Sequence, residues 1–147
     1  RRTSDGTSWE EIRDFDLQCG FGFGDTATAA VFGEDLYVAS VTNLGGGPIC
    51  RSRDGVTWEP LDGPVTELAV FRGMLYAGLP AGGVMRTTDG LAWELLGPEE
   101  INGPASALGD LRGAVFVGSM NLNQGCEVWR FREPIPVWAQ PVTRATE

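Results

Sequence analysis

Histidine and lysine are both absent from the 147-residue sequence, so two of the side chains that enzymes use most are missing. Without an imidazole, no Ser-His or Cys-His nucleophile pair can form. Without lysine there is neither a Schiff base nor a P-loop lysine. Any catalysis would have to depend on carboxylates, tyrosine or arginine. No apolar run approaches the roughly 20 residues that cross a bilayer, and we expect no membrane span.

Positive charge and cysteine are also scarce. Twenty acidic residues against eleven arginines give a net charge of −9, which repels a phosphate backbone, so we expect no nucleic-acid partner. The three cysteines lack C-x-x-C spacing, which disfavours structural zinc, and we expect no metal and no cofactor. Cys50 lies in an apolar stretch and is expected to be buried, whereas Cys19 and Cys126 could pair in an oxidising compartment.

Glycine and proline, by contrast, are abundant: 21 Gly and 9 Pro interrupt the chain too often for a helical domain. Between these breakers an internal repeat is visible in residues 32–40, 71–79 and 111–119. Its aromatic positions, Tyr37, Tyr76 and Phe116, follow one another after 39 and 40 residues. The two tyrosines alternate with small residues at equivalent positions, so we expect them in a core and not as nucleophiles.

A second motif, Arg-x-x-Asp-Gly-x-x-Trp, has the same Arg-to-Trp spacing of seven residues in three copies and is one residue longer in a fourth. The copies are Arg2–Trp9, Arg51–Trp58, Arg86–Trp93 and the degenerate Arg130–Trp138. Asp-Gly between alternating residues predicts a two-residue type I′ hairpin. We expect the arginines to pair with acids on adjacent strands or with the turn aspartate.

Each unit of about 40 residues contains four expected strands, which in the first complete unit are 27–32, 36–41, 49–53 and 56–61, with residues 45–48 as a breaker. A repeated four-stranded antiparallel meander of this length predicts the blades of an all-β propeller. The expected organisation is a half blade at 1–12, a linker at 13–25, and blades at about 26–62, 64–97 and 103–142.

The (Ser/Thr)-x-Asp-Gly-x-x-Trp turns resemble the Asp-box, or bacterial neuraminidase repeat, of sialidase-like propellers. The repeat as a whole resembles a broad class of exported bacterial propeller proteins. The usual Asp-box has one more residue between the aspartate and the aromatic, so these turns are a shortened variant. The resemblance implies an extracellular or periplasmic location, turn-capping aspartates and tryptophans between blades. The residues concerned are Asp5, Asp54 and Asp89, and Trp9, Trp58, Trp93 and Trp138.

About three and a half blades do not close a ring, which takes about four to eight blades. We therefore expect either a piece of a longer chain or a ring that another chain completes. Ligand binding is expected in the loops between second and third strands, where amides could hydrogen-bond sugar hydroxyls, although such residues also form ordinary turns. The candidates are Asn43, Asn121, Asn123 and Gln124.

The expected function is a non-catalytic binding or interaction module with a carbohydrate or protein ligand. Two alternatives remain open at this point. One is a fragment of a sialidase-like, glycoside-acting enzyme whose catalytic residues lie elsewhere. The other is an architectural subunit of a ring or coat. Fold alone does not decide among the three.

Overall fold

The computed structural model describes residues 3–11, 18–22, 26–42, 45–96 and 101–132. Eleven strands lie in this part of the chain, all in antiparallel sheets, so the predicted all-β class is confirmed. The first sheet contains β1 (Thr26–Phe32), β2 (Asp35–Thr42), β3 (Gly45–Ser52) and β4 (Glu59–Val65). The second contains β5 (Glu67–Phe71), β6 (Met74–Gly78), β7 (Val84–Thr87) and β8 (Glu94–Leu96). The third contains β9 (Ala105–Leu111), β10 (Ala114–Ser119) and β11 (Val128–Arg132).

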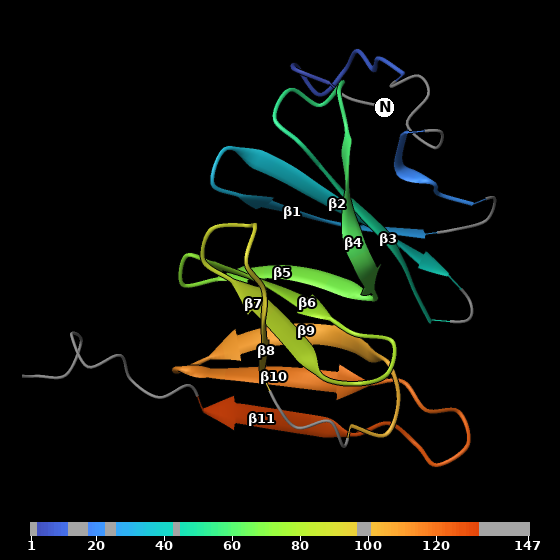
Figure 1. Ribbon diagram of the computed structural model, residues 1–147, viewed down its shortest axis with the longest axis vertical. Helices are drawn as coiled ribbons and strands as arrows, with labels where there is room; N and C mark the ends of the chain where they lie inside the picture. The colour runs from blue at the N-terminus through green and yellow to red at the C-terminus, as the bar shows by residue number, and fades with distance from the viewer. Residues whose placement is uncertain (1–2, 12–17, 23–25, 43–44, 97–100, 133–147) are drawn as a thin grey trace, which may run out of the picture.

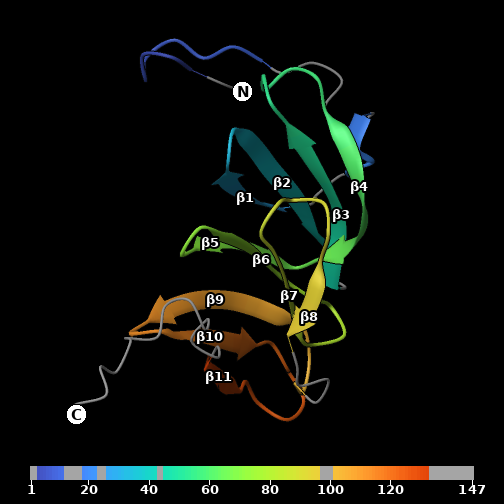
Figure 2. The same cartoon turned by 60° about the vertical axis from the view of Figure 1, so that its left-hand side comes forward.

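The three sheets follow one another along the long axis of the molecule, in chain order (Figures 1 and 2). The first strand of each sheet contacts the first strand of the next sheet, β1 with β5 and β5 with β9. The hydroxyl of Thr28 on β1 donates to Glu67 on β5 over 2.8 Å. The hydroxyl of Thr66, directly before β5, donates to the backbone carbonyl of Ala105 on β9. Both contacts join residues 39 positions apart, so the sheets meet through equivalent positions of the repeat.

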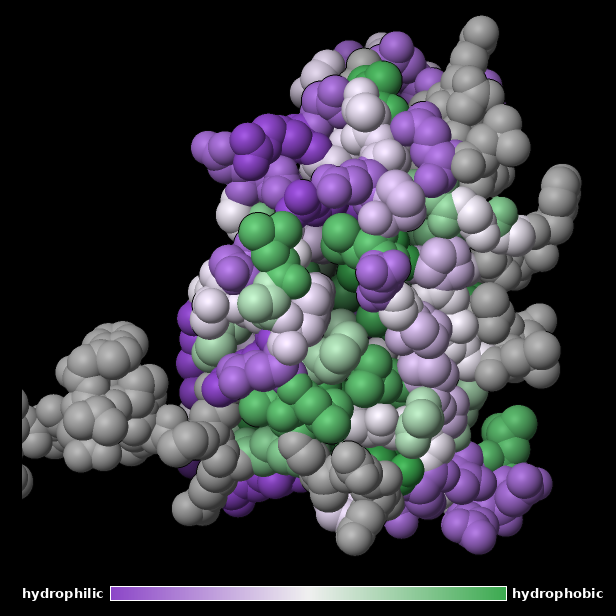
Figure 3. All heavy atoms as spheres, in the orientation of Figure 1, coloured by the Kyte–Doolittle hydropathy of each residue, from purple (hydrophilic) through white to green (hydrophobic). Residues whose placement is uncertain are grey.

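Two apolar clusters fill the spaces between the sheets, because successive residues of a strand point to opposite faces. Tyr37 and Ala39 of β2 pack with Leu75 and Ala77 of β6 between the first and second sheets. Tyr76, on the other face of β6, packs with β9 and β10 between the second and third sheets. Each tyrosine is 1% exposed, which confirms the prediction that both belong to the core. Figure 3 shows apolar side chains gathered where the second and third sheets meet.

The hairpin turns differ from the prediction. Arg72-Gly73 and Arg112-Gly113 form two-residue connections in which φ is positive at both positions, as in a type I′ turn. The Asp54-Gly55 connection is wider: Arg51 pairs with Glu59, and φ is positive at Gly55 but not at Asp54. The predicted type I′ hairpin at Asp-Gly is therefore wrong. The cause is the aspartate side chain, which bonds to the turn backbone as described below.

The glycine-rich stretch 45–48 was expected to break the chain and instead begins β3. Its glycines permit close approach of neighbouring strands. A Cβ on Gly46 would lie 2.6 Å from the carbonyl oxygen of Val65, and one on Gly47 would lie 2.8 Å from that of Ser40. Side chains there would push β2 and β4 away, so glycine is compatible with a strand at these two positions.

A disulfide joins Cys19 to Cys50, with 5.9 Å between their Cα atoms, and Cys126 is free and exposed. Cys19 therefore pairs with Cys50 and not with Cys126, the pairing that the sequence left open, and the predicted burial of Cys50 is confirmed. Cys50 lies on the face of the first sheet that points away from the second sheet, where it packs with Cys19, Val38 and Trp58. No helix in the described ranges is long and apolar enough to cross a membrane.

Candidate functional site

The Asp-Gly turns have one repeated geometry. In the copy at Asp54, Oδ1 accepts the backbone N–H groups of Val56 and Thr57, each over 2.8 Å. The hydroxyl of Ser52 accepts the N–H of Gly55 over 2.8 Å. The same three bonds recur in the other two described copies, with donors Leu91, Ala92 and Gly90 to Asp89 and Thr87, and donors Thr7, Ser8 and Gly6 to Asp5 and Thr3.

These hydrogen bonds stabilise the ionised carboxylates. The N–H groups of Thr57 and Val56 lower the pKa of Asp54 to about 2. The pKa of Asp89 is lowered by the N–H groups of Ala92 and Leu91, and that of Asp5 by those of Ser8 and Thr7. Carboxylates held ionised by their own turn are poor proton donors near neutral pH. The three aspartates therefore stabilise their turns and are not suited to donate a proton.

We expect Asp54→Ala to lower the melting temperature at neutral pH, and Asp54→Asn to lower it less because the amide keeps an acceptor oxygen. The folded pKa of about 2 lies below the unfolded value of about 3.9. The contribution of the carboxylate is thus fully present above pH ~4 and is lost as the pH falls through ~2. Melting curves of the wild type and Asp54→Ala should converge on acidification. A constant separation down to pH ~2 would contradict this assignment.

The tryptophans of the four motifs differ in burial. Trp58 is buried beside the disulfide, and Trp93 is partly buried against the cluster between the first and second sheets. Trp9, in contrast, is 60% exposed, so its expected place in a core is not found. The reason is that none of the three sheets packs over it. Trp138 lies outside the described residues.

Two of the four motif arginines pair across adjacent strands, as predicted, whereas Arg130 forms no ion pair with a described residue and Arg2 lies outside the described residues. Arg51 on β3 contacts Glu59 on β4 over 2.9 Å, and Arg86 on β7 makes the equivalent contact with Glu94 on β8. Each arginine also lies directly opposite the aromatic residue of the repeat in its sheet, Arg51 opposite Tyr37 and Arg86 opposite Tyr76. These ion pairs occupy the guanidinium groups and leave them poorly suited to hold a ligand.

The predicted ligand residues do not converge on a pocket. The side chain of Asn121 donates to the carbonyl of Asn102 and accepts the backbone N–H groups of Asn123 and Gln124 over 3.0 and 2.9 Å. Its amide therefore organises the β10–β11 loop and has little capacity left for a ligand. Asn123 and Gln124 are exposed on the same loop, and Asn43 lies outside the described residues.

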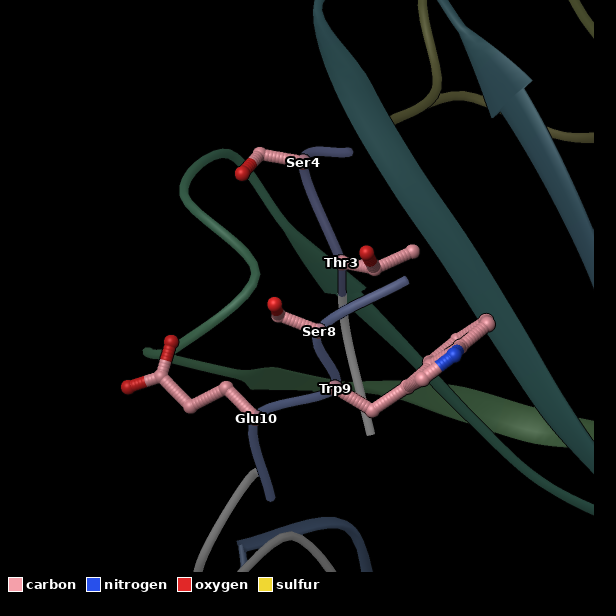
Figure 4. A pocket seen from close by; sticks show the side chains of 5 residues that line it. All are labelled: Thr3, Ser4, Ser8, Trp9 and Glu10. Atoms are coloured by element: carbon pink, nitrogen blue, oxygen red, sulfur yellow. The ribbon is translucent and has the colours of Figure 1, made fainter. Parts of the chain in front are cut away.

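A shallow depression of about 570 Å³ surrounds the first Asp-Gly turn and is lined by Thr3, Ser4, Ser8, Trp9 and Glu10. In Figure 4 the indole of Trp9 and the carboxylate of Glu10 project in opposite directions from adjacent residues. An exposed indole next to hydroxyl groups offers a stacking face and hydrogen-bonding partners together. The sequence placed Trp9 in a core because its motif matches those of Trp58 and Trp93, and no local signal distinguishes it.

No family model matches the chain, and neither a curated protein nor a solved structure resembles it at a significant level.

Proposed function

We propose that the three sheets are consecutive blades of a β-propeller and that the chain is a non-catalytic binding or interaction module. The observation that carries the proposal is the repeated contact between first strands. Thr28 with Glu67, and Thr66 with Ala105, are each separated by 39 residues, and the ion pair of Arg72 with Asp110 by 38. In a propeller the blades surround one axis, so contacts between neighbouring blades recur with the length of the repeat.

Two features support a role without catalysis. The only two tyrosines are buried at equivalent positions of the repeat, where they pack and cannot reach a substrate. The turn aspartates are occupied by backbone N–H groups. A glycoside-acting enzyme built on this chain would need catalytic residues from outside the sequence, and an architectural ring subunit would need only the sheet faces.

The disulfide between Cys19 and Cys50 supports an extracellular or periplasmic location. Disulfides persist in oxidising compartments and are rare in a reducing cytoplasm. This bridge ties residues 18–22 to the first sheet over a buried tryptophan, so an oxidising environment contributes directly to the folded core.

Carbohydrate is the ligand class favoured by the depression at Trp9, since indole faces stack on sugar rings and the adjacent hydroxyls suit sugar hydroxyl groups. On a glycan array we expect the wild type to retain one class of glycan and Trp9→Ala to lose it. Leu122→Ala serves as the matched control, because Leu122 is 91% exposed at the distant β10–β11 loop. An array signal that survives in Trp9→Ala would exclude this site, and a blank array for the wild type would leave a protein ligand.

A further inference from the structure

The face of the third sheet that points away from the second sheet, here called the outer face, repeats an arrangement that is covered elsewhere. On β10, Phe116 lies opposite Gly109 of β9 and Arg130 of β11. Tyr37 likewise lies between Ala30 and Arg51, and Tyr76 between Ala69 and Arg86. In the first two sheets this aromatic, small residue and arginine face the next sheet. No described sheet covers the outer face, where Val128 is 77% exposed.

We propose that the outer face binds residues 3–11 of a second copy of this chain, with Trp9 of that copy packed beside Phe116. This contact covers the indole of Trp9, so it competes with the carbohydrate binding proposed above. The inference rests on the proposed propeller arrangement and names its partner. It joins the two uncovered parts of the repeat, one at each end of the described chain, in a head-to-tail contact.

The packing of Trp93 indicates against which kind of surface Trp9 would be buried. Trp93 belongs to the motif of the second sheet and packs against the cluster that contains Tyr37 of the first sheet. A motif tryptophan therefore packs toward the aromatic face of the preceding unit. Trp9 has the same place in its own motif and is 60% exposed, while Phe116 is the equivalent of Tyr37 and has no following sheet among the described residues. Trp9 thus lacks the aromatic face of a preceding unit, and Phe116 lacks the tryptophan of a following unit.

Charge favours the same pairing. Arg130 on the outer face and Arg112 at its hairpin make no ion pair with the described residues. Arg72, the equivalent of Arg112, bonds to Asp110 of the following sheet, which shows where such an arginine finds its partner. Residues 3–11 contain three acids, Asp5, Glu10 and Glu11, and no base. Opposite charge on the two surfaces orients the encounter and fixes the head-to-tail direction.

The number of described sheets is compatible with two copies. The described part of the chain contains three sheets, so two copies contain six, within the range of about four to eight blades that close a propeller. A head-to-tail contact closes when the rotation between copies returns to the start, and it otherwise continues as an open chain.

Sedimentation velocity of the 147-residue chain over a range of concentrations tests the proposal, and the expected species is a dimer of twice 15.8 kDa. Trp9→Ala removes the indole and Val128→Asp places an acid on the outer face. Both positions are exposed, so both variants should melt at the temperature of the monomeric wild type. Each variant alone should be monomeric. An equimolar mixture should form a one-to-one dimer, because each variant retains the surface that the other has lost.

Leu122→Asp is the matched control, since Leu122 is exposed but does not belong to the outer face, and it should dimerise like the wild type. A wild type that is monomeric at every concentration overturns the proposal. So does a dimer that both variants retain, which would use another surface, and so does a mixture that remains monomeric. None of these results contradicts the propeller arrangement, which intramolecular distances within one chain test separately.

Discussion

Replacement of Trp58 by alanine is expected to lower the free energy of unfolding by about 3–5 kcal/mol. The indole is 6% exposed and packs against Cys19, Val38 and Cys50, with Phe21 and Leu36 at the edge of the cluster. The backbone N–H of Trp58 also donates to the side chain of Gln18 over 2.9 Å. Because the disulfide holds one wall of this cluster in place, the site cannot collapse around the missing ring.

Urea denaturation followed by far-ultraviolet circular dichroism measures this loss. Leu122→Ala provides the control, since its side chain is 91% exposed and its removal leaves no cavity. A similar midpoint for Trp58→Ala and the wild type would show that residues 18–22 do not cover the first sheet, and the assignment of this face as core would fail.

Reduction of the disulfide is expected to lower the free energy of unfolding by about 3–4 kcal/mol, because the unfolded chain regains the loop entropy that the bridge removes. The bridge joins Cys19 to Cys50, which are separated by 31 positions in the sequence. Reduction also frees residues 18–22 from the first sheet, so Trp58 should become exposed to water and its fluorescence should shift to the red. Cys126→Ser is the matched control because that thiol is exposed and free. Equal unfolding midpoints with and without reductant, in the Cys126→Ser background, would contradict a structural role for the bridge.

The repeat predicted the core tyrosines because their positions are defined by alternation within one strand. Tyr37 and Tyr76 are both buried, and the arginine opposite each of them forms the expected ion pair with the neighbouring strand. Such features depend on period and register, which a sequence contains. The all-β class follows from the same pattern.

Features that depend on contacts between distant segments were missed. Glycine is common in loops, so the sequence predicts a breaker at residues 45–48. Only the close approach of Ser40 and Val65 explains glycine inside a strand. The wide Asp54 turn results from side-chain acceptors that a dipeptide pattern does not include. The partner of Cys19 could not be inferred without the face on which Cys50 lies.

The candidate site was missed for a related reason. Trp9 has the same motif as Trp58, and burial of either residue is decided by what packs over it and not by its neighbours in sequence. Asn121 was expected to face a ligand, yet its amide satisfies the backbone of its own loop. Both cases concern residues whose local chemistry suits two roles, between which only the surrounding structure decides.

The central claim, that the sheets are blades around an axis, is tested most directly by distances between spin labels on equivalent ends of the first strands. Val31, Val70 and Asp110 occupy these positions, and pairs of cysteines can be introduced there in a Cys126→Ser background with the native disulfide intact. We expect two similar distances between neighbouring sheets and a distance from residue 31 to residue 110 that is clearly shorter than their sum, because blades around an axis lie on an arc. A distance equal to the sum would mean a straight stack of sheets and would contradict the propeller.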